Sequence, residues 1–170
     1  MTISQKTKDM MRKPMIQLAR ALAALLLPAL LLLAAAVPAR AQAENDILAV
    51  MERWSATYAA ATRGEEMLAL YHPDAVFFGT AFRSPFVGAA SFAPYFQAQF
   101  DNYRARRVTF EAPVIRLIGA DVATSTGLYR FNVTSLAGQA VEALYRYTFA
   151  LVRTAEGWVI IQHHSSQLPP

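Results

Sequence analysis

The sequence predicts a fold of the α+β class, in which helices come first and a run of strands follows. Apolar residues with helical spacing are concentrated within residues 44–103 of the 170-residue chain. Residues 105–166 favour strands instead, and short turn signals divide them into four. A block of strands after a block of helices is typical of an antiparallel sheet with its helices on one side. We therefore expect one domain, with a strongly curved sheet around its helices.

The N-terminal region has the composition of a secretory signal peptide. A basic lead precedes an apolar run at residues 21–37, and small-residue cleavage sites follow at Ala39-Arg40-Ala41 and Ala41-Gln42-Ala43. This order predicts a signal peptide over residues 1–43 and a periplasmic or secreted domain over residues 44–170. The alternative is an uncleaved membrane anchor, for which the apolar run is at the short end of the range.

Charge and cysteine content narrow the possible partners and cofactors. The chain has 16 Lys and Arg and 12 Asp and Glu. Residues 1–43 contain six of the basic residues and one of the acidic residues. The expected mature domain keeps 10 basic and 11 acidic residues, so its net charge is −1 and we expect no nucleic-acid partner. No cysteine is present, which excludes disulfides and thiolate zinc sites.

Three helices are expected before the strand block. Residues 44–62 form the first, and Gly64 interrupts its pattern. Its apolar stripe comprises Ile47, Val50, Met51, Trp54, Tyr58 and Ala61. Residues 65–70 form a short second helix, with two acidic residues in its first turn. Residues 89–103 form a third helix with an aromatic stripe, although Pro94 lies near its first turn.

The remaining segments are predicted as turns and strands. Tyr71-His72-Pro73-Asp74 favours a turn, because proline restricts the residue before it, and residues 75–79 follow as a buried strand. Four further strands are expected at residues 105–118, 122–134, 140–153 and 158–166. Their connections are as short as hairpin loops, which join antiparallel neighbours.

The hairpin loops predict which side chains share a face of the sheet. A three-residue loop at residues 136–138, with Gly138 left-handed, pairs Ser135 with Gln139, whereas a two-residue loop would place Arg130 and Arg146 on opposite faces. Pairing Arg153 with Trp158 in the last hairpin places Thr148 opposite His163. The predicted common face then comprises Leu128, Arg130, Leu144, Arg146, Thr148, His163 and Ser165.

Two arginines on a concave face predict a site for an anion. Buried guanidinium groups need partners, so Arg130 and Arg146 either bind a ligand carboxylate or form structural ion pairs with Glu111 or Glu142. The predicted ligand-binding residues are Arg130, Arg146, His163, Tyr58 and Thr148. The alternative for Tyr58 is an ordinary position in the core. The alternative for His163 is a structural role as a hydrogen-bonded pocket residue.

Metal and acid–base sites are less well supported. His163 and His164 are adjacent on a strand, so they point apart and cannot chelate one ion, and we expect no metal and no cofactor. His163 and Asp74 are the candidates for a general acid or base. Asp74 lies at an expected turn, which argues against the raised pKa that such a role requires.

Several segments resemble the NTF2-like (SnoaL-like) superfamily, and within it the association (hub) domain of calcium/calmodulin-dependent protein kinase II and its stand-alone bacterial relatives. The segments that carry the resemblance are Tyr71–Ala75, Phe92–Phe100, Pro113–Gly119, Tyr129-Arg130-Phe131, Arg146, Gly157-Trp158 and His163–Ser166. The resemblance implies a cone, with a curved antiparallel sheet wrapped around a long N-terminal helix and two further helices. It also implies association through the sheet face and a cavity in which Arg130 and Arg146 bind small carboxylates. Ala93 stands where the hub has a pocket histidine, and neither a kinase domain nor a calmodulin-binding segment is seen.

Three functions follow from these observations. The favoured one is an exported, non-catalytic protein that forms a homodimer or higher homo-oligomer and binds a small anionic ligand. The alternatives are a cone-fold enzyme of the cyclase, isomerase or dehydratase type, and a purely structural oligomerisation module. Fold alone does not decide among them.

Overall fold

The computed structural model describes residues 39–169, and a compact unit begins at Ala43. The expected signal peptide falls almost entirely on residues 1–38, outside the described part. The first helix is described over residues 39–60, so it starts earlier than predicted and ends within two residues of its predicted end. Its apolar stripe is buried as expected, and the ring of Trp54 stacks on that of Tyr58 with centroids 5.3 Å apart. No helix described over residues 39–169 is long and apolar enough to cross a membrane.

The segment after the first helix differs in part from the prediction. The second helix is present as the 3-10 helix η1 (Gly64–Leu70). The turn predicted at Tyr71–Asp74 is wrong, because these residues open strand β1 (Tyr71–Phe78). β1 pairs in parallel with the last strand, and its register shifts between Tyr71 and Val76. This irregular stretch accommodates Pro73, which cannot donate a ladder hydrogen bond.

The predicted third helix is divided in two. Short strand β2 (Phe86–Val87) leads to the 3-10 helix η2 (Ala89–Phe92), and α2 (Ala93–Asn102) follows directly. Pro94 lies in the first turn of α2, where its missing N–H has no helical partner to lose. The proline therefore starts a new helix instead of continuing the old one.

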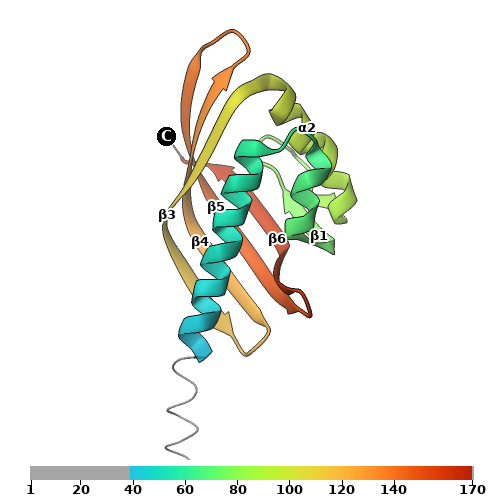
Figure 1. Cartoon of the computed structure of the whole chain (residues 1–170), viewed down its shortest axis with the longest axis vertical. Helices are drawn as coiled ribbons and strands as arrows, with labels where there is room; N and C mark the ends of the chain where they lie inside the picture. Colours follow the sequence, from blue (N-terminus) through green and yellow to red (C-terminus); the bar gives the residue numbers. More distant parts are fainter. Residues whose placement is uncertain (1–38, 170) are drawn as a thin grey trace, which may run out of the picture. The chain divides into compact units, whose positions relative to one another are not determined.

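Four long strands complete the domain, as predicted. They are β3 (Tyr103–Ile118), β4 (Val122–Ser135), β5 (Ala140–Thr154) and β6 (Gly157–Gln167), and each pairs antiparallel with the next. The sheet order is β2-β1-β6-β5-β4-β3. Figure 1 shows the first helix lying along this sheet, with α2 beyond its end. The α+β fold with a curved sheet is confirmed.

One of the two predicted hairpin registers is confirmed. Gly138 has φ +87°, and Leu128 lies opposite Arg146, as the three-residue loop requires. The last hairpin starts as predicted with Arg153 opposite Trp158, but the register shifts between Leu151 and Ala150. His163 consequently lies opposite Phe149, so the prediction that it faces Thr148 is wrong. A β-bulge of this kind moves every later side chain to the other face.

The bulge separates the residues predicted to share a face. His163 and Ser165 turn toward the helices and are buried, whereas Arg130, Arg146 and Thr148 lie on the opposite side of the sheet. We call the side packed on the first helix the core face, and the other side the outer face. The core face is strongly aromatic, with Trp54 contacting rings from four strands, namely Phe110, Tyr129, Phe149 and His163.

Candidate functional site

A pocket on the core face is lined by tyrosines. Its volume is about 250 Å³, and we call it the cone pocket. Five tyrosines line it, namely Tyr58, Tyr95, Tyr103, Tyr129 and Tyr145. The other lining residues are Thr80, Ala81, Phe82, Gln99, Phe131, Val133, Val141, Ala143, Ser165 and Gln167. Among residues 39–169 no charged side chain belongs to this lining, so the pocket offers hydrogen bonds and aromatic surface without a fixed charge.

A smaller cavity lies at the base of the cone pocket. It measures about 20 Å³ and shares Tyr58, Tyr95, Gln99, Tyr129 and Phe131 with the larger pocket. The rest of its wall consists of Trp54, Phe77, Phe96 and His163. A volume of this size holds roughly one water molecule, or one oxygen atom of a ligand.

His163 belongs to a buried chain of hydrogen bonds. Trp54 Nε1 donates to the hydroxyl of Tyr71 at 2.8 Å, and that hydroxyl lies 2.9 Å from His163 Nδ1. Donation from Tyr71 to Nδ1 satisfies the proton of this buried hydroxyl, and it corresponds to the neutral imidazole tautomer with its proton on Nε2. Nε2 lies 3.5 Å from the hydroxyl of Tyr129, a wall residue of the cone pocket.

Burial keeps His163 uncharged. The side chain is 2 % exposed and stacks on Phe77 with ring centroids 4.5 Å apart. Desolvation lowers the pKa of His163 to about 3, and the neighbouring His164 adds to the shift. His163 therefore holds Tyr129 in place as a neutral donor and is a poor proton acceptor at neutral pH.

Tyr58, which lines both the cone pocket and the smaller cavity, has a hydroxyl group that is not used in a hydrogen bond among the described residues. The side chain is 1 % exposed, and no partner is found for its buried hydroxyl in the described part of the chain. Burial raises the pKa of Tyr58 well above its usual value, and the neighbouring Tyr95 acts in the same direction. The group is therefore a neutral phenol, and an unpartnered buried hydroxyl of this kind is costly unless a ligand or water binds it.

Arg130 forms ion pairs on the outer face. Its Nε lies 2.7 Å from Glu111 Oε1, and its Nη1 lies 2.5 Å from Glu142 Oε1. These hydrogen bonds, to Glu111 first and then to Glu142, raise the pKa of Arg130. The structure thus realises the ion-pair alternative for this residue, and Arg130 does not line the cone pocket.

Arg146 and Thr148 line a separate depression on the outer face. Its volume is about 420 Å³, and its wall also contains Thr126, His164 and Ser166. Thr148 Oγ1 lies 3.1 Å from Thr126 Oγ1. The structure therefore brings Arg146 and Thr148 together with His164, and not with His163 as the predicted register required.

Asp74 lies away from both pockets. Its side chain is 88 % exposed, and its carboxylate lies 3.8 Å from His72 Nδ1. Across residues 39–169, no group of three or more His, Cys, Asp or Glu side chains is placed to hold a metal ion.

Most residues of the cone pocket were not predicted from the sequence. Tyr95, Tyr103, Tyr129 and Tyr145 come from α2, β3, β4 and β5, and no local motif connects them. Arg106 was also missed. Its guanidinium donates to the carbonyl oxygens of Tyr58 at 3.0 Å and Ala61 at 2.5 Å, at the end of the first helix. A cation is favourable there, because a helix C-terminus carries partial negative charge.

Solved structures that are similar to this chain share the fold described above. A candidate calcium/calmodulin-dependent protein kinase II association domain from Xanthomonas campestris is 27% identical with a TM-score of 0.67, covering 72% of this chain and 86% of its own. The C. elegans CaMKII association domain is 19% identical with a TM-score of 0.60, covering 75% and 97%. A candidate scytalone dehydratase from Novosphingobium aromaticivorans is 11% identical with a TM-score of 0.71, covering 78% and 89%. A search of curated protein sequences found no match.

Sequence comparison with family models agrees with the fold. The model of the SnoaL-like domain matches residues 47–170, which is most of the chain. The match begins in the first helix and includes every strand described above. The chain belongs to the SnoaL-like domain family, within the NTF2-like superfamily.

Proposed function

We propose that this protein binds a small, uncharged organic molecule in the cone pocket. The observation that carries the proposal is the buried hydroxyl of Tyr58, a residue of the pocket lining, which has no hydrogen-bond partner among residues 39–169. Since burial raises the pKa of Tyr58, its hydroxyl offers a proton to an oxygen acceptor such as a carbonyl. A cavity of about 150 Å³ already holds benzene, so the cone pocket suits a molecule of one or two rings.

The carboxylate ligand expected from the sequence loses its support at this pocket. It depended on Arg130 and Arg146 lining the cavity, and both lie on the outer face. Moving a carboxylate into a lining without a cation would be unfavourable. A carboxylate bound through Arg146 would have to lie in the outer-face depression instead of the cone pocket.

Binding without catalysis fits the pocket better than an enzymatic role. A general base needs a pKa near the working pH, and burial holds the pKa of His163 at about 3. The cone pocket lining contains no carboxylate, and Asp74 is exposed elsewhere. The likeness to a candidate dehydratase is at 11% identity and supports the fold only.

We further propose that the domain is exported and that its copies associate. The basic and apolar composition of residues 1–43 supports export. The two association domains among the similar structures support self-association, and the outer face of the sheet is available for it. Mass measurement of the protein secreted from a bacterial host tests export, since removal of residues 1–41 or 1–43 is expected.

A thermal-shift screen with matched ligands tests the binding proposal. 1-Tetralone, a neutral two-ring ketone, should raise the melting temperature of the purified protein, because it stabilises the folded state by mass action. 1-Naphthoate, of similar shape but charged, should give no shift through the cone pocket. Tyr58→Phe should reduce the shift with 1-tetralone at each ligand concentration, as expected for about tenfold weaker binding, whereas Arg146→Ala should keep the full shift. A shift with 1-naphthoate alone, lost in Arg146→Ala, would assign the site to the outer face instead.

A further inference from the structure

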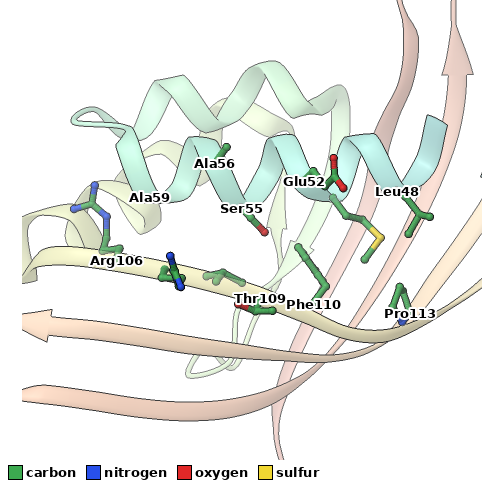
Figure 2. Close-up of a pocket in the computed structure, with 12 residues that line it drawn as sticks. Leu48, Glu52, Ser55, Ala56, Ala59, Arg106, Thr109, Phe110 and Pro113 are labelled. Atoms are coloured by element: carbon green, nitrogen blue, oxygen red, sulfur yellow. The ribbon is translucent and has the colours of Figure 1, made fainter. Parts of the chain in front are cut away.

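Strand β3 leaves one edge of the sheet open. It is the last strand in the sheet order, so only one of its two long edges is paired among residues 39–169. A groove of about 730 Å³ separates β3 from the first helix. Figure 2 shows Glu52, Ser55 and Ala56 on the helix side of this groove, and Thr109 and Phe110 on the strand. The helix therefore does not cover the edge.

Only a short part of this edge is suited to pairing. Ala112 has φ +42°, the register with β4 shifts between Glu111 and Val114, and Pro113 has no backbone N–H. A bulge and a proline are the devices by which sheets prevent pairing at an edge. The regular stretch ends at Glu111, and residues 105–111 pair with β4 without a break.

This stretch is complementary to itself. Arg107, Thr109 and Glu111 alternate with Val108 and Phe110, which turn to the core face and pack against the core. When two copies lie antiparallel about Thr109, Arg107 of each is directly opposite Glu111 of the other. Val108 then lies opposite Phe110. Opposite charges and apolar residues in directly opposite positions stabilise a strand pair.

Other antiparallel registers that keep the same side chains on each face of the joined sheet lack this complementarity. An axis at Val108 or Phe110 places Arg107 or Glu111 opposite threonine. An axis at Arg107 or Glu111 places like charges opposite each other, which is destabilising. Thr109 is therefore the one axis within Arg107–Glu111 that pairs the acidic with the basic residue.

We propose that β3 of one copy pairs antiparallel with β3 of a second copy about Thr109, joining two sheets into one. Glu111 keeps its contact with Arg130 at 2.7 Å and gains the second copy's Arg107. Symmetry places both first helices on the same side of the joined sheet. The groove gives room for the small helix residues Ser55, Ala56 and Ala59 of the two copies to approach. This interface is separate from the outer face.

Single cysteines test the register, because the chain contains none of its own. Thr109→Cys places two thiols on the symmetry axis. Directly opposite strand residues have Cα atoms about 4.5–5.5 Å apart, which suits a disulfide. We expect rapid formation of a covalent dimer under mild oxidation, at least tenfold faster than with Ala120→Cys, an exposed turn residue that reports random collision. Equal rates would overturn the proposal.

A second pair of variants fixes the axis. Arg107→Cys alone should not cross-link, since its counterpart is four residues away along the strand, whereas Arg107→Cys combined with Glu111→Cys should. Fast cross-linking of Arg107→Cys alone would place the axis at residue 107 and overturn the assigned register.

A charge reversal tests the interface without cysteine. Arg107→Glu faces the second copy's Glu111 with a like charge, so sedimentation should show at least a tenfold weaker association. Arg116→Glu, an exposed arginine of β3 beyond the bulge, is the matched control and should leave the association unchanged. Equal association of the two variants would contradict the proposal.

Discussion

His163 illustrates how one residue combines a structural role with a measurable electrostatic signature. It is held between Tyr71 and Tyr129 and surrounded by aromatic rings, so it stays neutral in the folded protein. The unfolded chain takes up a proton at the ordinary pKa of 6.5, whereas the folded protein does so only near 3. Between these values the unfolded state binds more protons. The free energy of unfolding therefore falls as the pH drops below 6.5.

The pH dependence of stability tests this role. Each pH unit below about 6 should cost up to roughly 1.4 kcal/mol through His163. His163→Gln should be less stable at pH 7, because it breaks the hydrogen bonds to the two tyrosines. Between pH 7 and pH 4.5 the variant should nevertheless lose less stability than the wild type, and the difference between the two losses should be about 2 kcal/mol. Parallel pH profiles in urea denaturation would show that His163 is not the group responsible.

At the scale of the elements, Arg106 joins three of them. Its guanidinium donates to Tyr58 and Ala61 at the end of the first helix and to Tyr103 at 2.9 Å at the end of α2. It also lies over the ring of Phe100 at 4.3 Å. β3 thus closes both helix ends with one side chain, and this contact positions Tyr58 and Tyr103 at the cone pocket.

Removing Arg106 should destabilise the domain more than removing an exposed arginine of the same strand. We expect Arg106→Ala to lower the free energy of unfolding by about 2–4 kcal/mol, because several carbonyl oxygens lose a charged donor. Arg106→Lys should recover only part of this loss, since an ammonium group cannot reproduce the planar fork. Arg116→Ala, at an exposed arginine of β3 outside the proposed interface, is the matched control and should change the value by less than about 0.5 kcal/mol. Equal losses in denaturant titrations would contradict the role of Arg106.

The elements also show what can be predicted from sequence. The loop before β5 was predictable, because Gly138 alone supplies the left-handed position that a three-residue hairpin needs. The bulge in β6 was not, because the run Trp158–Ile161 is apolar throughout and contains no glycine or proline that marks an extra residue. That single residue decided whether His163 or His164 lies beside Arg146. The fold followed from periodicity, whereas the site depended on a register that periodicity does not define.

The whole molecule separates its charges from its cavity. Aromatic hydroxyls gather inside the cone, while Arg130, Glu111 and Glu142 pair on the outer face. This division could not be predicted residue by residue, since the five tyrosines reach the pocket from five different elements. The interior of the cone therefore suits an uncharged ligand. The outer face and the β3 edge, where the charges lie, suit contacts with other protein copies.

The central claim is that the cone pocket recognises its ligand through Tyr58. Its most direct test is a calorimetric titration of 1-tetralone into the wild-type protein, Tyr58→Phe and Arg146→Ala at neutral pH. We predict that Tyr58→Phe binds about tenfold more weakly, a loss of about 1.4 kcal/mol, while Arg146→Ala binds as the wild type does. Without ligand, Tyr58→Phe should be at least as stable as the wild type, because the hydroxyl it removes has no partner in the part of the chain that the structure describes. Equal affinity of the wild type and Tyr58→Phe, or loss of binding in Arg146→Ala alone, would contradict the account.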